Sequence, residues 1–559
     1  MSKPKPYTSE PPTKTKGTDG QPSKWLALII VLALTLFTCS PILSTDKEFT
    51  NWDDAGYVIE QPLIKSLDGE SIRKMFDPAS IVMFNYHPVT MLSLAVDYER
   101  GYDADANTIN IAPFAFTNLL LHLANTLLVF FLAYRLSKKQ VWVAAIAAAL
   151  FGIHPMHIES VVWISERKDL LYCMFFLLSI MSYLKYTDEQ KLSFLALSLI
   201  CFIASCLSKA MAVPLPLTLL LTDHLLKRKL TARVWIEKLP FLIVSIIIGL
   251  YAVEVQHGAL MGREYGVMER ILLAANGYVQ YIVRFFAPVG LSAFYPYPAD
   301  NGIPGYYYLT LVIALVIVAI PIVLAVRKHK DADRLLWSIG LYSLMIALVL
   351  QFITIGNSTM NDRYTYVAYI GLCFGLASYI GDAIARVKYK TLALSGSLCF
   401  IIILAVTAYG RASVWQNSET LWRDVISKYP IEKDGKTNLN VKTAYKNLAD
   451  HYASRQEFDS AFAYYKTIVI TGLPDAEVWS NMGNIYVLRN DMPNALKAFN
   501  SSLDIDPTNY DTWFKRGLVY MYMKQPDKAV ADMDKVLQLK PGHSEAAVFK
   551  QQFSNAVHQ

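Results

Sequence analysis

The sequence predicts an all-α protein in two parts, a polytopic bundle of membrane helices followed by a soluble array of helical repeats. The chain of 559 residues is 54% hydrophobic and only 18% charged, whereas soluble proteins have about 25% charged residues. Apolar runs of roughly 20 residues, the length that a bilayer core requires, recur as far as residue 410. After that point the composition becomes polar. We therefore divide the chain into a tail at 1–24, a membrane domain at 25–410 and a repeat domain at 411–559.

The N-terminal segment is predicted to be a disordered cytoplasmic tail. Its lysines stand among Pro, Ser, Thr and Gly residues, a composition that cannot bury a core. The apolar run at 25–43 is longer than the apolar region of a typical signal peptide and lacks a clear small-residue cleavage site. We therefore expect it to be the first membrane-spanning helix.

About eleven membrane-spanning helices are predicted. The stretch 192–226 is long enough for two of them, broken around Ser208 and Lys209. A further apolar run, 271–290, contains an arginine and a proline, so we expect a re-entrant or interfacial segment there. The other predicted spans are 25–43, 114–134, 141–158, 168–186, 239–256, 306–326, 335–353, 366–384 and 391–409.

The distribution of Lys and Arg orients the chain, because short loops rich in these residues stay in the cytoplasm. Such loops lie at 135–139, 185–191, 227–238, 327–334 and 386–390. The large loop 44–113, which is rich in Asp and Glu, is then predicted to lie outside. An odd number of crossings places everything after residue 410 on the same extracytoplasmic side. That side is the periplasm in a bacterium and the lumen of the endoplasmic reticulum in a eukaryote.

Charge and cysteine content narrow the range of partners. The net charge of +6 does not indicate nucleic acid, because the basic residues cluster between apolar runs and not on one soluble face. All six cysteines lie in or beside apolar segments, so neither a disulfide framework nor a CxxC metal site is predicted. Membrane lipids are the environment that this composition implies.

The C-terminal domain repeats a motif every 34 residues, as in Trp479 and Trp513 or Gly483 and Gly517. Further positions in the same frame are Tyr486 and Tyr520, Ala495 and Ala529, Pro507 and Pro541, with Tyr445, Leu448, Tyr452, Ala461 and Tyr465 one repeat earlier. The pattern resembles the tetratricopeptide repeat. The resemblance implies about three repeats and a capping helix, with aromatic residues mostly in the core and a concave surface that binds a protein or peptide.

Ionisable residues gather at the predicted outer ends of the helices, where they are costly and by default functional. Asp53 and Asp54 follow the first span, and His87 lies later in the same loop. The other candidates are His154, Arg167, Lys168, Asp169, Lys209 and Arg363. A solvated acidic pair, hydrogen-bonded histidines at helix ends, snorkelling cations and an internal ion pair are the alternative interpretations.

The order of these motifs resembles the membrane glycosyltransferases of the C-type (GT-C) fold. Within that class it is similar to the transmembrane O-mannosyltransferases that carry C-terminal tetratricopeptide repeats. The resemblance covers NWDDAGYVIEQPLI (51–64), HPMHIESVVWISERKDLL (154–171), DRYTYVAYIGLCF (362–374) and RASVWQNSETLW (411–422). One departure is SKA at 208–210, where relatives often have an acidic residue after the lysine.

The resemblance implies an enzyme that moves a sugar, mannose in such relatives, from polyprenyl or dolichyl phosphate to a hydroxyl of a protein acceptor on the extracytoplasmic face. Asp53 or Asp54 would accept the hydroxyl proton, and the other carboxylate would orient the acceptor or hold a divalent cation such as Mg²⁺ or Mn²⁺. Donor phosphate or sugar contacts would come from His87, His154, Arg167, Lys168, Asp169, Lys209 and Arg363. The alternative function is a non-enzymatic membrane scaffold whose repeats assemble an envelope complex.

Overall fold

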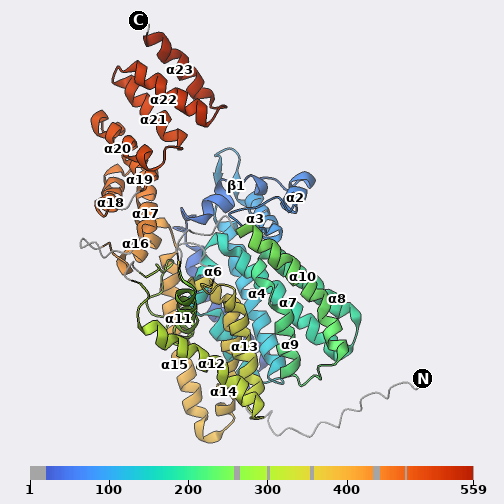
Figure 1. Cartoon of the computed structure of the whole chain (residues 1–559). Helices are drawn as coiled ribbons and strands as arrows, with labels where there is room; N and C mark the ends of the chain where they lie inside the picture. Colours follow the sequence, from blue (N-terminus) through green and yellow to red (C-terminus); the bar gives the residue numbers. More distant parts are fainter. Residues whose placement is uncertain are drawn as a thin grey trace.

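The computed structural model describes residues 21–256, 265–298, 302–352, 358–431, 441–472 and 475–557. Within these ranges the chain is almost entirely helical, and its only paired strands, β1 (Tyr102–Asp103) and β2 (Thr108–Ile109), form a small antiparallel hairpin. Figure 1 shows a bundle of long helices with the C-terminal helices stacked beyond one end of it. The structure confirms the predicted all-α fold, a membrane-type bundle followed by a helical solenoid.

Long apolar helices form the bundle. In the described ranges, seven are long and apolar enough to cross a membrane, or eight if one bent pair counts as a span. The seven spans contain α1 (Lys24–Cys39), α4 (Ala112–Leu136), α7 (Arg167–Glu189), α10 (Ala232–Gln256), α12 (Tyr306–Val326), α14 (Thr365–Ile384) and α15 (Lys390–Val414). The shorter helices are α8 (Leu192–Ser208), α9 (Leu215–Leu225) and α13 (Ala332–Ala347). The predicted number of about eleven crossings depends on these shorter helices and stays a prediction.

One predicted span differs from its expected form. The run 141–158 is predicted as a single helix, but α5 (Val141–Gly152) is bent by 51° from the segment Pro155–Val162, which contains α6 (Ile158–Val162). Pro155 explains the break, because it has no backbone N–H and disfavours helical backbone angles at the residue before it. The chain after the break runs through the interior, since every residue from 151 to 171 is buried.

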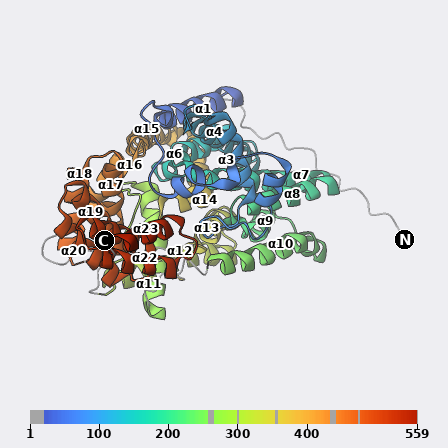
Figure 2. The ribbon, with the colours of Figure 1, turned by 90° about the horizontal axis from the view of Figure 1, so that it is seen from above.

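Helix α11 (Val267–Phe286) lies across the bundle axis, seen end-on in Figure 1 and lengthwise in Figure 2. It carries charged residues near both ends and is not among the candidate spans. One side of it is buried, including Leu272 and Tyr278. This placement agrees with the interfacial segment that the sequence predicts at 271–290.

The large loop 44–113 folds as a helical cap on one end of the bundle. It contains a π-helical turn at Ala55–Ile59, a 3₁₀ turn at Pro62–Ile64, and the helices α2 (Gly69–Met75) and α3 (Pro88–Gly101). Figure 1 places this cap at the same end of the bundle as the C-terminal helices. The loop and the repeats therefore share one end of the molecule, as the sequence predicts. The compartment on that side stays a prediction.

The C-terminal helices form a solenoid of antiparallel pairs. The helices are α16 (Ser418–Lys428), α17 (Lys442–Ser454), α18 (Phe458–Ile470), α19 (Ala476–Leu488), α20 (Met492–Ile505), α21 (Tyr510–Tyr522), α22 (Pro526–Leu539) and α23 (Ser544–Val557). Gly483 faces the Phe499 ring and Gly517 faces Met533 so closely that a Cβ atom at either glycine would collide. These two positions of the predicted motif therefore allow the two helices of a pair to approach each other.

Candidate active site

The two carboxylates of the acidic pair have different surroundings. Asp54 is fully buried, and one of its oxygens accepts hydrogen bonds from the backbone N–H and the hydroxyl of Thr50, each at 2.9 Å. Its other oxygen accepts from the Ser165 backbone N–H at 3.0 Å and from the Ser165 hydroxyl. Asp54 therefore ties the loop 44–113 to the segment that leads into α7.

Asp53 is only partly buried, and no described residue donates a hydrogen bond to its carboxylate. Burial raises the pKa of Asp53 above its usual value, and the nearby cations of Lys168 and Arg363 counteract part of this rise. A carboxylate with free lone pairs can accept a proton from another molecule. Of the two predicted catalytic carboxylates, Asp53 is therefore the one that is available for chemistry.

Three cations surround the buried carboxylate of Glu166. Lys168 Nζ and Arg363 Nε lie 3.1 Å and 3.2 Å from its Oε1 atom. Lys209 Nζ lies 3.3 Å from the other oxygen. Since the cations come from α7, from the turn before α14 and from the break between α8 and α9, Glu166 draws three separate elements together.

Two further buried carboxylates complete the cluster. Asp169 Oδ1 lies 2.5 Å from Lys209 Nζ, and Glu159 forms an ion pair with the Arg363 guanidinium. Lys209 thus has carboxylate partners even without an acidic neighbour in the sequence. Buried ions are tolerated where each finds a partner of opposite charge, and this cluster satisfies that condition before any ligand arrives.

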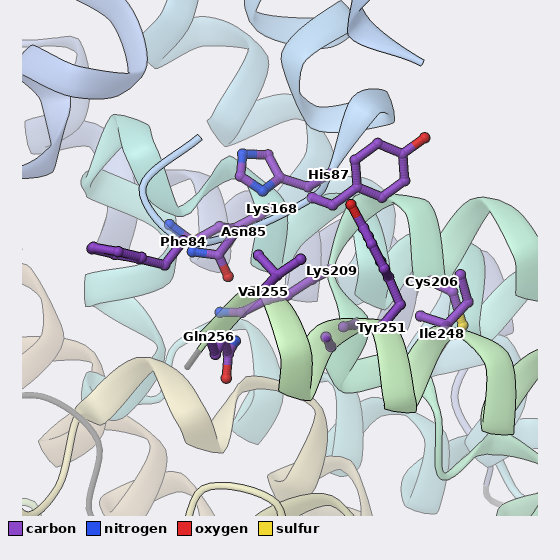
Figure 3. Close-up of a pocket in the computed structure, with 13 residues that line it drawn as sticks. Phe84, Asn85, His87, Lys168, Cys206, Lys209, Ile248, Tyr251, Val255 and Gln256 are labelled. Atoms are coloured by element: carbon purple, nitrogen blue, oxygen red, sulfur yellow. The ribbon is translucent and has the colours of Figure 1, made fainter. Parts of the chain in front are cut away.

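A small pocket lies beside this cluster. Figure 3 shows side chains of the 84–87 loop, α7, the end of α8 and α10 converging on it. Lys168, Lys209 and His87 supply its basic side chains. The other lining residues are Phe84, Asn85, Tyr86, Cys206, Ala210, Ile248, Tyr251, Ala252, Val255 and Gln256. The pocket therefore combines cationic and amide groups with an apolar wall.

His87 is buried, and neither of its ring nitrogens has a hydrogen-bond partner in the described structure. Burial lowers the pKa of His87 to about 3, so the ring is neutral at neutral pH. Its ring centroid lies 5.3 Å from that of Tyr57, and the same tyrosine ring lies 4.3 Å from Lys168 Nζ. A neutral imidazole offers one donor and one acceptor to a ligand.

Six of the predicted site residues do not line this pocket: Asp53, Asp54, His154, Arg167, Asp169 and Arg363. His154 is fully buried, with its Nε2 atom 3.1 Å from the Phe285 carbonyl oxygen and its Nδ1 atom accepting from the Met156 N–H. Arg167 pairs with Asp97 and donates to three further residues on α3 and α4. The structure therefore brings together Asp53, Lys168, Asp169, Lys209 and Arg363, with His87 across the pocket.

The acidic pair does not form a metal site by itself. Both oxygens of Asp54 already accept protein hydrogen bonds, and the charged groups nearest to Asp53 include two cations. Among the described residues no group of three or more His, Cys, Asp or Glu side chains could hold a metal ion. The residues present do not fit the Mg²⁺ or Mn²⁺ site considered from the sequence, and we derive no step through a metal.

Three important carboxylates are missing from the set predicted from the sequence. Glu159 and Glu166 lie in the polar segment 154–171, but nothing in the sequence shows that they pair with Arg363. Asp97 is the partner of the fully buried Arg167. Asp97 could have been found from its position directly after the apolar stretch MLSLAV, because burying an unpaired carboxylate there would cost free energy.

The fold and the pocket define a polytopic membrane-type protein with a helical repeat array and a charged pocket at the end of the bundle that carries the array. Family models for the TPR repeat and the tetratricopeptide repeat match residues 483–523 and 510–543, so repeats of the predicted type are present in this part of the chain. Among curated proteins, the chain is 31% identical to Protein O-mannosyl-transferase Tmtc1 of Drosophila melanogaster over 131 residues. That match covers 23% of this chain and 14% of the relative.

Other relatives carry the same description. Tmtc2 of Drosophila melanogaster is 33% identical over 25% of this chain and 15% of its own length. Human Protein O-mannosyl-transferase TMTC1 is 37% identical over 14% of this chain and 9% of its own length. The chain is thus similar to proteins named O-mannosyl-transferases, as the sequence resemblance predicts. The matches span only about one seventh or less of these relatives.

Solved structures of repeat proteins also match. They include the first TPR of Spaghetti (RPAP3) bound to an HSP90 peptide, at 18% identity and a TM-score of 0.21, over 21% of this chain and 94% of that one. The MamA protein matches at 18% identity and a TM-score of 0.20, over 25% of this chain and 88% of that one. TM-scores this low carry no argument about this protein.

Proposed function

We propose that the chain is a glycosyltransferase that moves a sugar, mannose by similarity to the named relatives, from a polyprenyl or dolichyl phosphate to a hydroxyl group of a protein. The observation that carries this proposal is a free carboxylate, Asp53, which interacts electrostatically with Lys168, one of the cations that line the pocket. The transfer takes place at the end of the bundle that carries the repeats, which we assign to the extracytoplasmic side. The repeat array holds the protein acceptor.

The pocket offers the groups that a lipid phosphate needs. Lys168 contacts one carboxylate and Lys209 contacts two, and an ammonium group has three N–H donors. Each lysine therefore keeps a donor for a phosphate oxygen. His87 adds a neutral donor from the opposite side. Arg363 and Asp169 hold the lysine cluster in place, while Arg167 and His154 position the helices behind it.

The apolar wall of the pocket suits the lipid part of the donor. Helix α10 supplies Ile248, Tyr251 and Val255 to the pocket, and only 6% of its most apolar window is buried. The exposed apolar residues of α10 include Ile243, Ile246, Ile247 and Leu250. A polyprenyl chain can therefore lie along α10 within the bilayer while its phosphate reaches the lysines.

The chemistry follows from these positions. The acceptor hydroxyl loses its proton to Asp53 as its oxygen bonds to the anomeric carbon of the sugar. The bond between that carbon and the phosphate oxygen breaks, and the electron pair leaves with the lipid phosphate. Lys168 and Lys209 stabilise the charge that grows on this phosphate. One displacement inverts the configuration of the anomeric carbon.

The test is release of lipid phosphate by the purified protein, incubated with a panel of polyprenyl-phosphate sugars and an acceptor peptide. We expect Asp53→Asn to lower the turnover by about 10²–10⁴-fold, the range of a lost general base. The matched control is Asp105→Asn, an exposed carboxylate in the same loop. Wild-type turnover in a correctly inserted Asp53→Asn protein, or no release from any donor by the wild type, would overturn the proposal.

A further inference from the structure

Asn51, which lies two positions before Asp53, forms hydrogen bonds with the first two helices of the C-terminal solenoid. The Asn51 backbone N–H donates to the Ser418 hydroxyl at 2.9 Å, and its side-chain amide donates to the Asn447 carbonyl at 2.6 Å. The Trp422 indole N–H donates to the Asn51 side-chain oxygen at 2.8 Å. All three partners lie on α16 or α17, more than 360 positions further along the chain.

The next residue, Trp52, lies between aromatic rings of both parts of the molecule. It stacks on Trp163 with ring centroids 4.5 Å apart, and its distance to Trp422 is 5.1 Å. Trp163 in turn lies 5.2 Å from the Arg363 guanidinium carbon. A continuous row of side chains therefore leads from α16 to the cation cluster, and aromatic pairs in such contact hold preferred geometries.

A second set of contacts fixes the start of the same loop. Lys47 Nζ donates to the Trp415 carbonyl oxygen at 2.5 Å, and the Glu48 backbone N–H donates to the Gln416 carbonyl at 2.8 Å. The Glu48 carboxylate also pairs with Arg455 of the first repeat at 2.7 Å. The loop that carries the acidic pair is thus attached to residues on both sides of α16.

Asp53 has no hydrogen-bond partner of its own in the described structure, so its neighbours in the chain fix its position. On the C-terminal side, Asp54 is anchored to Thr50 and Ser165. On the N-terminal side, the anchors of Asn51 and Trp52 belong to the repeat domain and to the interior of the bundle. Removing the anchors from one side would allow the Asp53 carboxylate to shift.

We infer that Trp422 and Asn51 are positioning residues for the transfer reaction, and that α16 is a functional part of the transferase unit and not only the start of the repeats. This inference rests on the proposed function, because it assigns Asp53 as the group being positioned. Helix α16 then holds Asp53 at the distance that proton transfer needs, whether or not the rest of the array is occupied.

Trp422→Phe in the full-length protein tests this inference. The substitution keeps an aromatic ring beside Trp52 but removes the N–H that binds Asn51. We expect turnover to fall by about 10-fold, because small misplacements of catalytic groups lower rates by one to two orders of magnitude. The KM for the lipid donor should stay unchanged, because no residue of α16 lines the pocket. The assay is the release of lipid phosphate with a short soluble acceptor peptide.

Trp513→Phe is the matched control. Trp513 belongs to a later repeat, and like Trp422 it donates its indole N–H to an oxygen acceptor, here the Pro507 carbonyl at 2.9 Å. It lies on α21, so its loss should leave turnover at the wild-type level. An equal loss in both variants, or wild-type turnover in Trp422→Phe, would overturn the inference.

Asn51→Ala removes the acceptor of the Trp422 hydrogen bond. It tests the same inference if Trp422→Phe does not insert into the membrane, and its turnover should also fall. Combining the two substitutions should lower turnover no further than Asn51→Ala alone, because Asn51→Ala already removes the hydrogen bond that Trp422→Phe breaks, together with the one to Asn447. Independent, multiplying losses would contradict the inference. A dead Asp53→Asn with a fully active Trp422→Phe would leave the proposed function intact and remove only this inference. An active Asp53→Asn would remove both.

Discussion

Two adjacent aspartates of identical chemistry have different environments in this protein. Asp54 is fully buried with both oxygens occupied, while Asp53 is partly exposed and free of hydrogen bonds from described residues. The sequence identifies the pair but cannot rank its members, because the difference depends on Ser165, which is 111 positions away. The sequence also identifies Lys168 and Lys209 without showing that they share a pocket.

The pH dependence of turnover reports on Asp53. Its pKa is raised by burial, and a base must be unprotonated, so activity is lost as the pH falls through this raised pKa. Lys168 lowers the pKa of Asp53, so Lys168→Met should move the acid limb of the normalised pH profile to higher pH. Lys185→Met, an exposed lysine on the same helix, should leave the limb in place. A limb that stays in place in Lys168→Met would contradict the assignment of Asp53 as the base.

Asp54→Asn should act on stability. The new amide nitrogen would face N–H and O–H donors of Thr50 or Ser165, which it cannot accept from. A buried polar group that loses its hydrogen-bond partner lowers the free energy of unfolding by about 1–3 kcal/mol. We expect a lower apparent Tm in detergent for Asp54→Asn, whereas Asp53→Asn should unfold at the wild-type temperature. Equal unfolding temperatures for the two variants would show that Asp54 does not fasten the loop.

At the scale of elements, hydropathy predicts where the helices lie but not how they break or pair. It places a single span at 141–158, because averaging over a window hides the effect of Pro155. It correctly excludes α11 from the spans, because a charged residue and a proline interrupt that run. The ion pairs that join α3 to α7 and α7 to the turn before α14 depend on side chains distant in sequence, so no local pattern reveals them.

The pairing of Arg167 with Asp97 gives a test at this scale. Arg167→Met leaves the Asp97 carboxylate buried without its main partner, and breaking such a buried pair costs about 3–5 kcal/mol. We expect a marked fall in the apparent Tm, and Asp97→Asn in the same protein should restore part of it. Arg100→Met is the control, since Arg100 is an exposed partner of the same carboxylate and should change the Tm little.

At the scale of the whole molecule, the positive-inside rule places the outer loop and the repeats on one side, and the structure places both at one end of the bundle. The direct contact between them, such as the hydrogen bond from Asn51 to Asn447, could not be predicted from the sequence. The repeat motif itself was readable, because each position has a local packing reason. Contacts across nearly 400 positions leave no such local trace.

Cysteine accessibility tests the predicted sidedness. In a background with the exposed Cys399 changed to Ser, Asp105→Cys in the outer loop and Lys524→Cys in the repeats should react from the extracytoplasmic side with an impermeant maleimide. Lys388→Cys, between α14 and α15, should react only from the cytoplasm. Labelling of Asp105→Cys and Lys524→Cys from opposite sides would contradict the shared face.

The attachment of α16 to the loop before Asp53 has a practical consequence for anyone building chimaeras of this protein. The change in amino-acid composition suggests exchanging the repeat domain for another one at a junction near residue 411. A graft joined there would discard Trp415, Ser418 and Trp422 together with the native repeats. A junction placed after Ile431 would retain all three, so the incoming module would inherit a loop whose attachment to α16 is already complete.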